Sequence, residues 1–72
     1  MTNTIHTKEY KLFIEKLKSA RLEAGLKQTD VAKKMGKPQS YISKIESGEQ
    51  RVDVIELNKL AKLYGKDIKY FV

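Results

Sequence analysis

The fold is decided by residues Gln28–Gly48, which read QTDVAKKMGKPQSYISKIESG. Two short helical patterns lie on either side of Gly36, a residue that can take the positive φ of a tight turn. Pro38 suits the start of a helix and not its interior, so the helix after Gly36, which is the third of the chain, is predicted over residues 38–47. Because this connection is too short for two helices packed side by side, it indicates a steep crossing, as in a helix-turn-helix.

Amphipathic patterns on both sides of this stretch predict further helices. Before it, apolar residues recur at three- and four-residue spacing between Tyr10 and Ala24. After it, Asp53 is the predicted N-cap of a fourth helix, and residues 67–72 form a last turn. No segment alternates with the period of a strand. We therefore expect an all-α, compact five-helix domain over residues 8–72, preceded by a flexible tail at residues 1–7.

The composition excludes several classes of protein. The chain has 72 residues, a net charge of +6 and no cysteine, which rules out disulfides, a thiolate metal site and a cysteine nucleophile. No apolar run approaches the roughly 18 residues of a membrane span, and the N-terminus lacks the apolar core of a signal peptide. We expect a cytoplasmic protein with no membrane association.

The residues of a catalytic site are also missing. The single histidine, His6, lies in the predicted tail, and Glu9 and Glu15 fit the solvated face of the first helix. The sequence has no paired carboxylates, nucleophile–base pair or glycine-rich phosphate loop. We expect no enzyme activity, no metal site and no cofactor.

The helix predicted at residues 38–47 has two different faces. If Ile42 and Ile45 point inward, a wheel at 100° per residue leaves short polar side chains outside, with Gln39 at the N-terminal shoulder. Such side chains can donate hydrogen bonds to base edges in the DNA major groove and accept them there, although a weakly helical solvated surface has the same composition. The outward set is Ser40, Ser43, Lys44 and Ser47.

Charge is segregated along the chain. Between Lys27 and Lys44 there are five lysines against Asp30 alone, or five minus one, +4. Between Glu46 and Glu56 the balance reverses to four acids against Arg51. The overall charge alone fits either a lysine-solubilised surface or a polyanionic partner, but the segregation favours a domain that docks one side on phosphates.

Several strings carry a resemblance to a known family. They are LKSARLEAGLKQ at residues 17–28, Val31-Ala32 followed by Gly36, and YISKIESG at residues 41–48. Over residues 17–71 the sequence resembles the Xre/Cro-type helix-turn-helix family of phage repressors and small bacterial regulators. The resemblance implies a five-helix, lambda-repressor-like fold that binds double-stranded DNA in a sequence-specific manner. It also implies control of transcription, most commonly repression.

The same resemblance implies roles for single side chains. It assigns base contacts to Gln39, Ser40, Ser43 and Lys44, and a contact with a base or a phosphate to Tyr41. It assigns phosphate contacts to Gln28, Lys27, Lys37, Ser47 and Arg51. Lys27 stands where the family often has a capping Ser or Thr, and Lys37 where it commonly has an apolar residue, so their backbone contacts depart from the family pattern. Arg21 and Glu46 match a structural ion pair between the first and third helices.

Two kinds of partner stay open at this stage. A DNA-binding homodimer would recognise an inverted-repeat operator. A protein-interaction module, such as an antitoxin or an adaptor, would depend on a protein partner as much as on DNA. At the chain end, Ile68 and Phe71 are predicted core residues, whereas Tyr70 and Val72 either form part of a dimer contact or only close the core.

Overall fold

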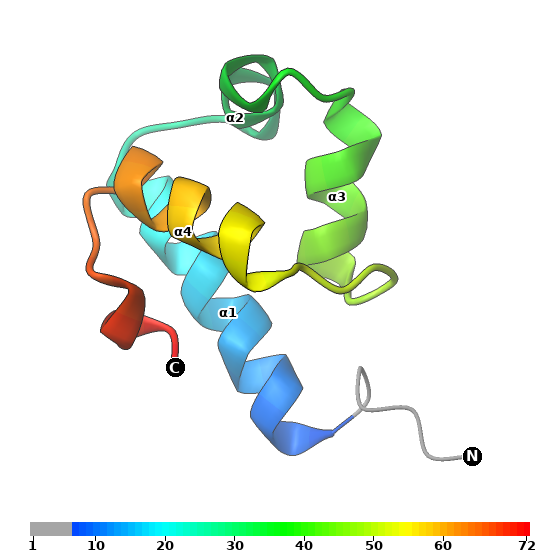
Figure 1. The fold of residues 1–72 in the computed structure, drawn as a ribbon. Coiled ribbons are helices and arrows are strands. Elements are labelled where there is room, and N and C mark those ends of the chain that lie inside the picture. The colour runs from blue at the N-terminus through cyan, green and yellow to red at the C-terminus, as the bar shows by residue number, and fades with distance from the viewer. Residues whose placement is uncertain (1–6) are drawn as a thin grey trace.

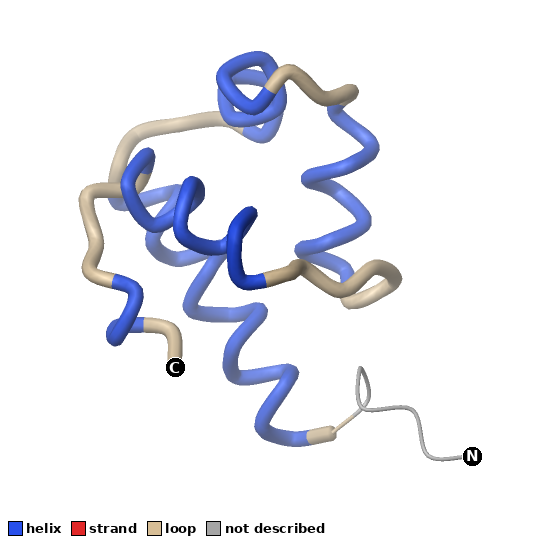
Figure 2. Tube along the Cα trace, in the orientation of Figure 1, coloured by secondary structure: helices blue, strands red, loops and turns tan. Residues whose placement is uncertain are grey.

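The computed structural model describes residues 7–72, which form four α-helices and one short 3₁₀-helix (Figure 1). Figure 2 shows no strand in this part of the chain. The expected all-α class is confirmed. Residues 1–6, which include His6 and most of the predicted tail, lie outside the described residues. The helices are α1 (Lys8–Glu23), α2 (Gln28–Met35), α3 (Gln39–Ser47), α4 (Val54–Leu63) and the 3₁₀-helix Ile68–Tyr70.

The prediction of five full helices is wrong at the last element. The final turn is a three-residue 3₁₀-helix, held by hydrogen bonds from Tyr70 N to Asp67 O and from Phe71 N to Ile68 O. In a 3₁₀-helix residues i and i+3 lie above one another, so Ile68 and Phe71 share a face. That face meets the core, where Phe71 is buried and Ile68 half-buried. This tight turn therefore suits the two apolar residues at the chain end.

Local hydrogen bonds explain where the helices begin. The Thr7 hydroxyl accepts from Tyr10 N at 3.2 Å at the start of α1. At the start of α4, Asp53 Oδ1 accepts from Glu56 N at 2.8 Å, as the sequence predicts for a capping residue. Before α2, the backbone N–H of Lys27 donates to Asp30 Oδ2 at 2.8 Å.

The turn between α2 and α3 depends on one glycine. Gly36 ends α2 in the left-handed region at φ 69°, and no atom lies within 4 Å of the position a Cβ would take. Glycine is thus required by the backbone conformation and not by space. Lys37 N donates to Ala32 O at 2.9 Å and closes the turn. In Figure 1, α2 is seen along its axis while α3 runs lengthwise, so the two helices cross steeply.

The core draws on all four α-helices and on the chain end. Ala20 of α1 and Ala32 of α2 are fully buried, and their small side chains allow the helix axes to approach closely. Tyr70 is half-buried, with its ring edge-on to Phe71 at 5.0 Å, so it packs onto its own domain, whereas Val72 is exposed. The buried apolar residues are Leu17, Ala20, Val31, Ala32, Tyr41, Ile42, Ile45, Leu57, Leu60, Ala61, Tyr64 and Phe71.

Tyr41 belongs to this core. Only 8% of it is exposed, and its hydroxyl is buried with no hydrogen-bond partner among residues 7–72. Burial, together with the nearby Glu56 carboxylate, raises the pKa of Tyr41 above its ordinary value. The residue was expected to contact a base or a phosphate, but this placement turns the ring away from solvent.

Because the Tyr41 hydroxyl has no hydrogen-bond partner among residues 7–72, the effect of removing it on the free energy of unfolding can be predicted. We expect Tyr41→Phe to leave the free energy of unfolding unchanged or to raise it by up to about 1–3 kcal/mol, because no hydrogen bond is lost. Tyr41→Ala removes the ring as well and should lower it by about 3–5 kcal/mol. Urea unfolding followed by circular dichroism measures both. A clear loss of stability in Tyr41→Phe would mean that the hydroxyl has a partner in solution.

Candidate nucleic-acid interface

Helix α3 separates its apolar and polar residues as the wheel predicts. Ile42 and Ile45 are each 1% exposed and anchor the helix to the core. The opposite side carries only short or neutral side chains and one lysine, all exposed: Gln39, Ser40, Ser43, Lys44 and Ser47. This surface is bare of apolar groups and rests on a rigid element.

A bidentate ion pair ties α3 to α1. Arg21 Nε donates to Glu46 Oε2 at 2.7 Å, and Arg21 Nη2 donates to Glu46 Oε1 at 3.0 Å. The third guanidinium nitrogen, Nη1, donates to Leu26 O at 2.9 Å. The two side chains are only 7% and 6% exposed, and the hydrogen bonds to Glu46 raise the pKa of Arg21. The structure therefore brings together the two residues that the sequence placed in an ion pair.

The ion pair continues into a chain of amide side chains. Gln28 Nε2 donates to Glu46 Oε1 at 3.0 Å, and Gln39 Nε2 donates to Gln28 Oε1 at 3.2 Å. Gln28 is the first residue of α2, and Gln39 is the first of α3. The family resemblance implied a separate DNA contact for each glutamine and did not predict this link. Nothing in the local pattern signals it, because the two residues meet only through the crossing of α2 and α3.

The direction of these bonds is set by chemistry. An ionised carboxylate such as Glu46 can only accept, so Gln28 must turn its amide nitrogen toward it. The Gln28 oxygen then faces Gln39, which has to donate. Gln39 thereby retains a second N–H and its own carbonyl oxygen, neither of which has a hydrogen-bond partner in the described part of the chain.

The remaining predicted phosphate contacts lie apart from this chain of side chains. Lys27 is exposed beside Gln28, and Lys37 Nζ lies 5.3 Å from the centre of the Tyr41 ring. Ser47 Oγ lies 3.1 Å from Lys44 O and 3.0 Å from Glu49 Oε2, and these two acceptors share its single hydroxyl proton. The Arg51 guanidinium lies 5.6 Å from the centre of the Tyr10 ring on α1. Ser47 and Arg51 are thus already engaged within the domain.

Two other kinds of site are absent from the described part of the chain. Across residues 7–72 no three His, Cys, Asp or Glu residues lie close enough together to hold a metal ion. Within the same range, no helix is both long and apolar enough to cross a lipid bilayer. The polar face of α3 and its neighbours is therefore the feature to explain.

The buried position of Glu46 predicts a large effect of neutralising it. Glu46→Gln leaves Arg21 charged and buried without a counter-ion, and we expect the free energy of unfolding to fall by about 3–5 kcal/mol. Glu23 is a matched control, because it pairs with Lys66 at 2.9 Å while 60% of its side chain is exposed. Glu23→Gln should cost less than about 1 kcal/mol. Equal losses in urea unfolding would contradict a structural role for the Arg21–Glu46 pair.

The chain also matches a known family. A family model described as helix-turn-helix matches residues 17–71, which is more than half of the chain and includes α2, α3, α4 and the C-terminal part of α1. No curated protein matches the sequence. The matched range agrees with the resemblance seen in the sequence, and its centre is the α2–α3 pair described above. The chain therefore belongs to the Xre/Cro-type helix-turn-helix family of DNA-binding regulators.

Proposed function

We propose that this protein is a sequence-specific transcriptional repressor of the cytoplasm that binds double-stranded DNA as a homodimer and has no catalytic activity. In this proposal α3 enters the major groove and its exposed side reads the bases. The main support for this proposal is the hydrogen bond from Gln39 to Gln28. It orients an exposed side chain at the start of α3.

Gln39 offers the hydrogen-bonding pattern that matches adenine. Its free N–H suits the N7 acceptor of that base, and its free carbonyl oxygen suits the N6 donor. Because the Gln28 bond has already restricted the amide, less side-chain entropy is lost on binding. Lys44 is suited to guanine O6 and N7, and Ser40 and Ser43 to several bases. Tyr41 is left out of this set because it lies in the core.

Contacts to the phosphate backbone form the second part of the proposal. Gln28, the exposed Lys27 and the exposed Lys37 lie next to the start of α2 or the start of α3 and supply a donor or a positive charge. Ser47 and Arg51 can join them only by leaving their contacts with Glu49 and Tyr10. We expect the charges of Lys27 and Lys37 to contribute to the salt dependence of binding, whereas Gln28 is neutral.

A homodimer needs an apolar contact, and α4 offers one. Val54 and Ile55, adjacent on its first turn, are 65% and 64% exposed. They follow directly on the loop after α3, so a two-fold contact there would hold the α3 helices of the two subunits at a set distance from each other. We propose this pair as the centre of the contact, since Tyr70 packs on its own domain.

The base-reading set can be tested by selecting bound sequences from a random duplex pool. We expect Gln39→Ala and Lys44→Ala each to lose about 1–3 kcal/mol of discrimination at one particular base pair. Lys18→Ala, which removes an exposed lysine from α1, is the charge-matched control and should leave the preference unchanged. Gln28→Ala should weaken binding to all sequences and also relax the preference at the Gln39 base pair, because Gln39 loses its fixed orientation.

A selection in which Gln39→Ala and Lys44→Ala keep the parent preference would overturn α3 as the reading helix. A protein that binds every duplex equally, and only at low salt, would overturn sequence-specific regulation and favour a protein-interaction module.

The dimer contact predicts a dependence on operator geometry. The parent chain should protect an inverted repeat with half-sites about 34 Å apart, or a multiple of that distance. Ile55→Lys should shift sedimentation toward the monomer and lower the affinity for the inverted repeat toward that for one half-site. Leu22→Lys introduces the same charge at another exposed apolar residue, on α1, and should do neither. If Leu22→Lys dissociates the dimer and Ile55→Lys does not, the dimer contact lies on α1 and not on α4.

A further inference from the structure

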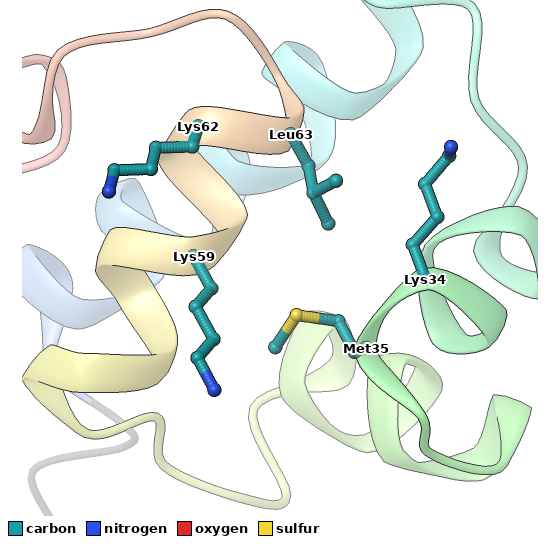
Figure 3. A pocket seen from close by; sticks show the side chains of 5 residues that line it. All are labelled: Lys34, Met35, Lys59, Lys62 and Leu63. Atoms are coloured by element: carbon teal, nitrogen blue, oxygen red, sulfur yellow. The ribbon is translucent and has the colours of Figure 1, made fainter.

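A pocket of about 380 Å³ lies between α2 and α4, and none of its lining residues is among those assigned above to DNA (Figure 3). It is lined by Lys34, Met35, Lys59, Lys62 and Leu63. Figure 3 shows the Met35 and Leu63 side chains extending into the space between the two helices, whereas the side chains of Lys34, Lys59 and Lys62 point outward in different directions. Lys34 and Met35 lie at the end of α2, and Gln28 is its first residue. At a rise of 1.5 Å per residue, Met35 is about 10 Å from Gln28 along the helix axis.

The floor and the rim of this pocket differ in character. Met35 and Leu63 are half-buried and pack against the core, so their outer surfaces form an apolar floor that solvent can reach. All three rim residues are lysines and are exposed, and no carboxylate lines the pocket. The site therefore combines a small apolar surface with a charge of one sign.

The three rim lysines have no partner within the described residues. The side chains of Lys34, Lys59 and Lys62 form no hydrogen bond, ion pair or ring contact there. Other lysines of the chain do have such contacts, as Lys66 does with Glu23 and Lys37 does with the Tyr41 ring. Three uncompensated like charges on the two helices beside the pocket attract anionic groups to this side of the domain.

We propose that this pocket docks an acidic amphipathic segment of a partner protein. One apolar side chain of that segment lies against Met35 and Leu63, and carboxylates around it reach the lysines. The lysines come from two helices on either side of the floor, so several separated negative charges match them better than one. A helix with acidic residues three and four positions from an apolar residue has this arrangement. The flexible thioether of Met35 can adapt to the inserted side chain.

Other occupants match the pocket less well. A second copy of this chain, related by a two-fold axis, would bring the same three lysines against each other. A phosphate backbone would satisfy the lysines but has no apolar group for Met35 and Leu63. The proposal does not depend on DNA binding, because it uses none of the residues proposed to contact bases or phosphates.

A labelled helical peptide tests the proposal with the full-length chain. The probe carries one leucine flanked by glutamates at i−4, i−3, i+3 and i+4, and two matched probes replace the glutamates by glutamine or the leucine by serine. We expect saturable binding of the first probe in fluorescence polarisation at low salt and clearly weaker binding of the other two. In NMR spectra the Met35 and Leu63 methyl signals should shift on binding, while the signals of Gln39 and Ser43 stay in place.

Matched triple variants separate the pocket from general charge. Lys34→Gln/Lys59→Gln/Lys62→Gln should weaken peptide binding by about tenfold, if each exposed pair contributes a modest amount. Lys8→Gln/Lys11→Gln/Lys18→Gln changes the net charge equally on exposed positions of α1 and should stay within about twofold of the parent. Circular dichroism checks that both variants are folded.

Several results would overturn the proposal. Equal binding of the glutamine probe, equal losses in both triple variants, or shifts confined to α3 would each exclude docking at this pocket. Binding of N-acetyl-leucine as tight as that of the peptide would assign the pocket to small carboxylates instead. If the pocket variant loses duplex affinity and the parent binds no peptide, the lysines contact the DNA backbone.

Discussion

The arrangement of the first three helices depends on the buried ion pair between Arg21 and Glu46. Either charge alone in this interior would be more unfavourable than the pair is favourable, so α1 and α3 must move together. Glu46 Oε1 also accepts from Gln28, which adds the start of α2 to the same unit. One electrostatic constraint thus sets the positions of three helices and, through Gln28, the orientation of Gln39 on the exposed side of α3.

The small size of the domain explains why this constraint matters. A chain of 72 residues buries a modest core, and small residues such as Ala20 and Ala32 let its helices pack closely. Helix α3 gives Ile42 and Ile45 to that core and leaves its other side free of apolar residues. Because the core and the ion pair hold the helix, its backbone does not have to be ordered when a partner binds, and the ordering cost is limited to its exposed side chains.

Local patterns in the sequence are sufficient for most of the fold but not for the details of the site. The N-cap at Asp53 and the turn at Gly36 depend on neighbouring residues, so both could be predicted. The burial of Tyr41 could not, because the wheel places it on a flank whose exposure depends on α4. The bond between Gln28 and Gln39 joins residues eleven positions apart in two crossing helices. The short last turn likewise depends on how Ile68 and Phe71 meet the core.

Charge along the sequence is not the same as charge in space, and α2 shows the difference. The run of lysines between Lys27 and Lys44 looks like one basic surface, yet the structure divides it. Lys27 lies beside Gln28 at the start of α2, whereas Lys34 joins Lys59 and Lys62 at a separate pocket at its end. Helix α2 is therefore shared by two surfaces. A partner that docks at its end without displacing the helix leaves the Gln28–Gln39 bond at its start in place, so the two surfaces can be used separately.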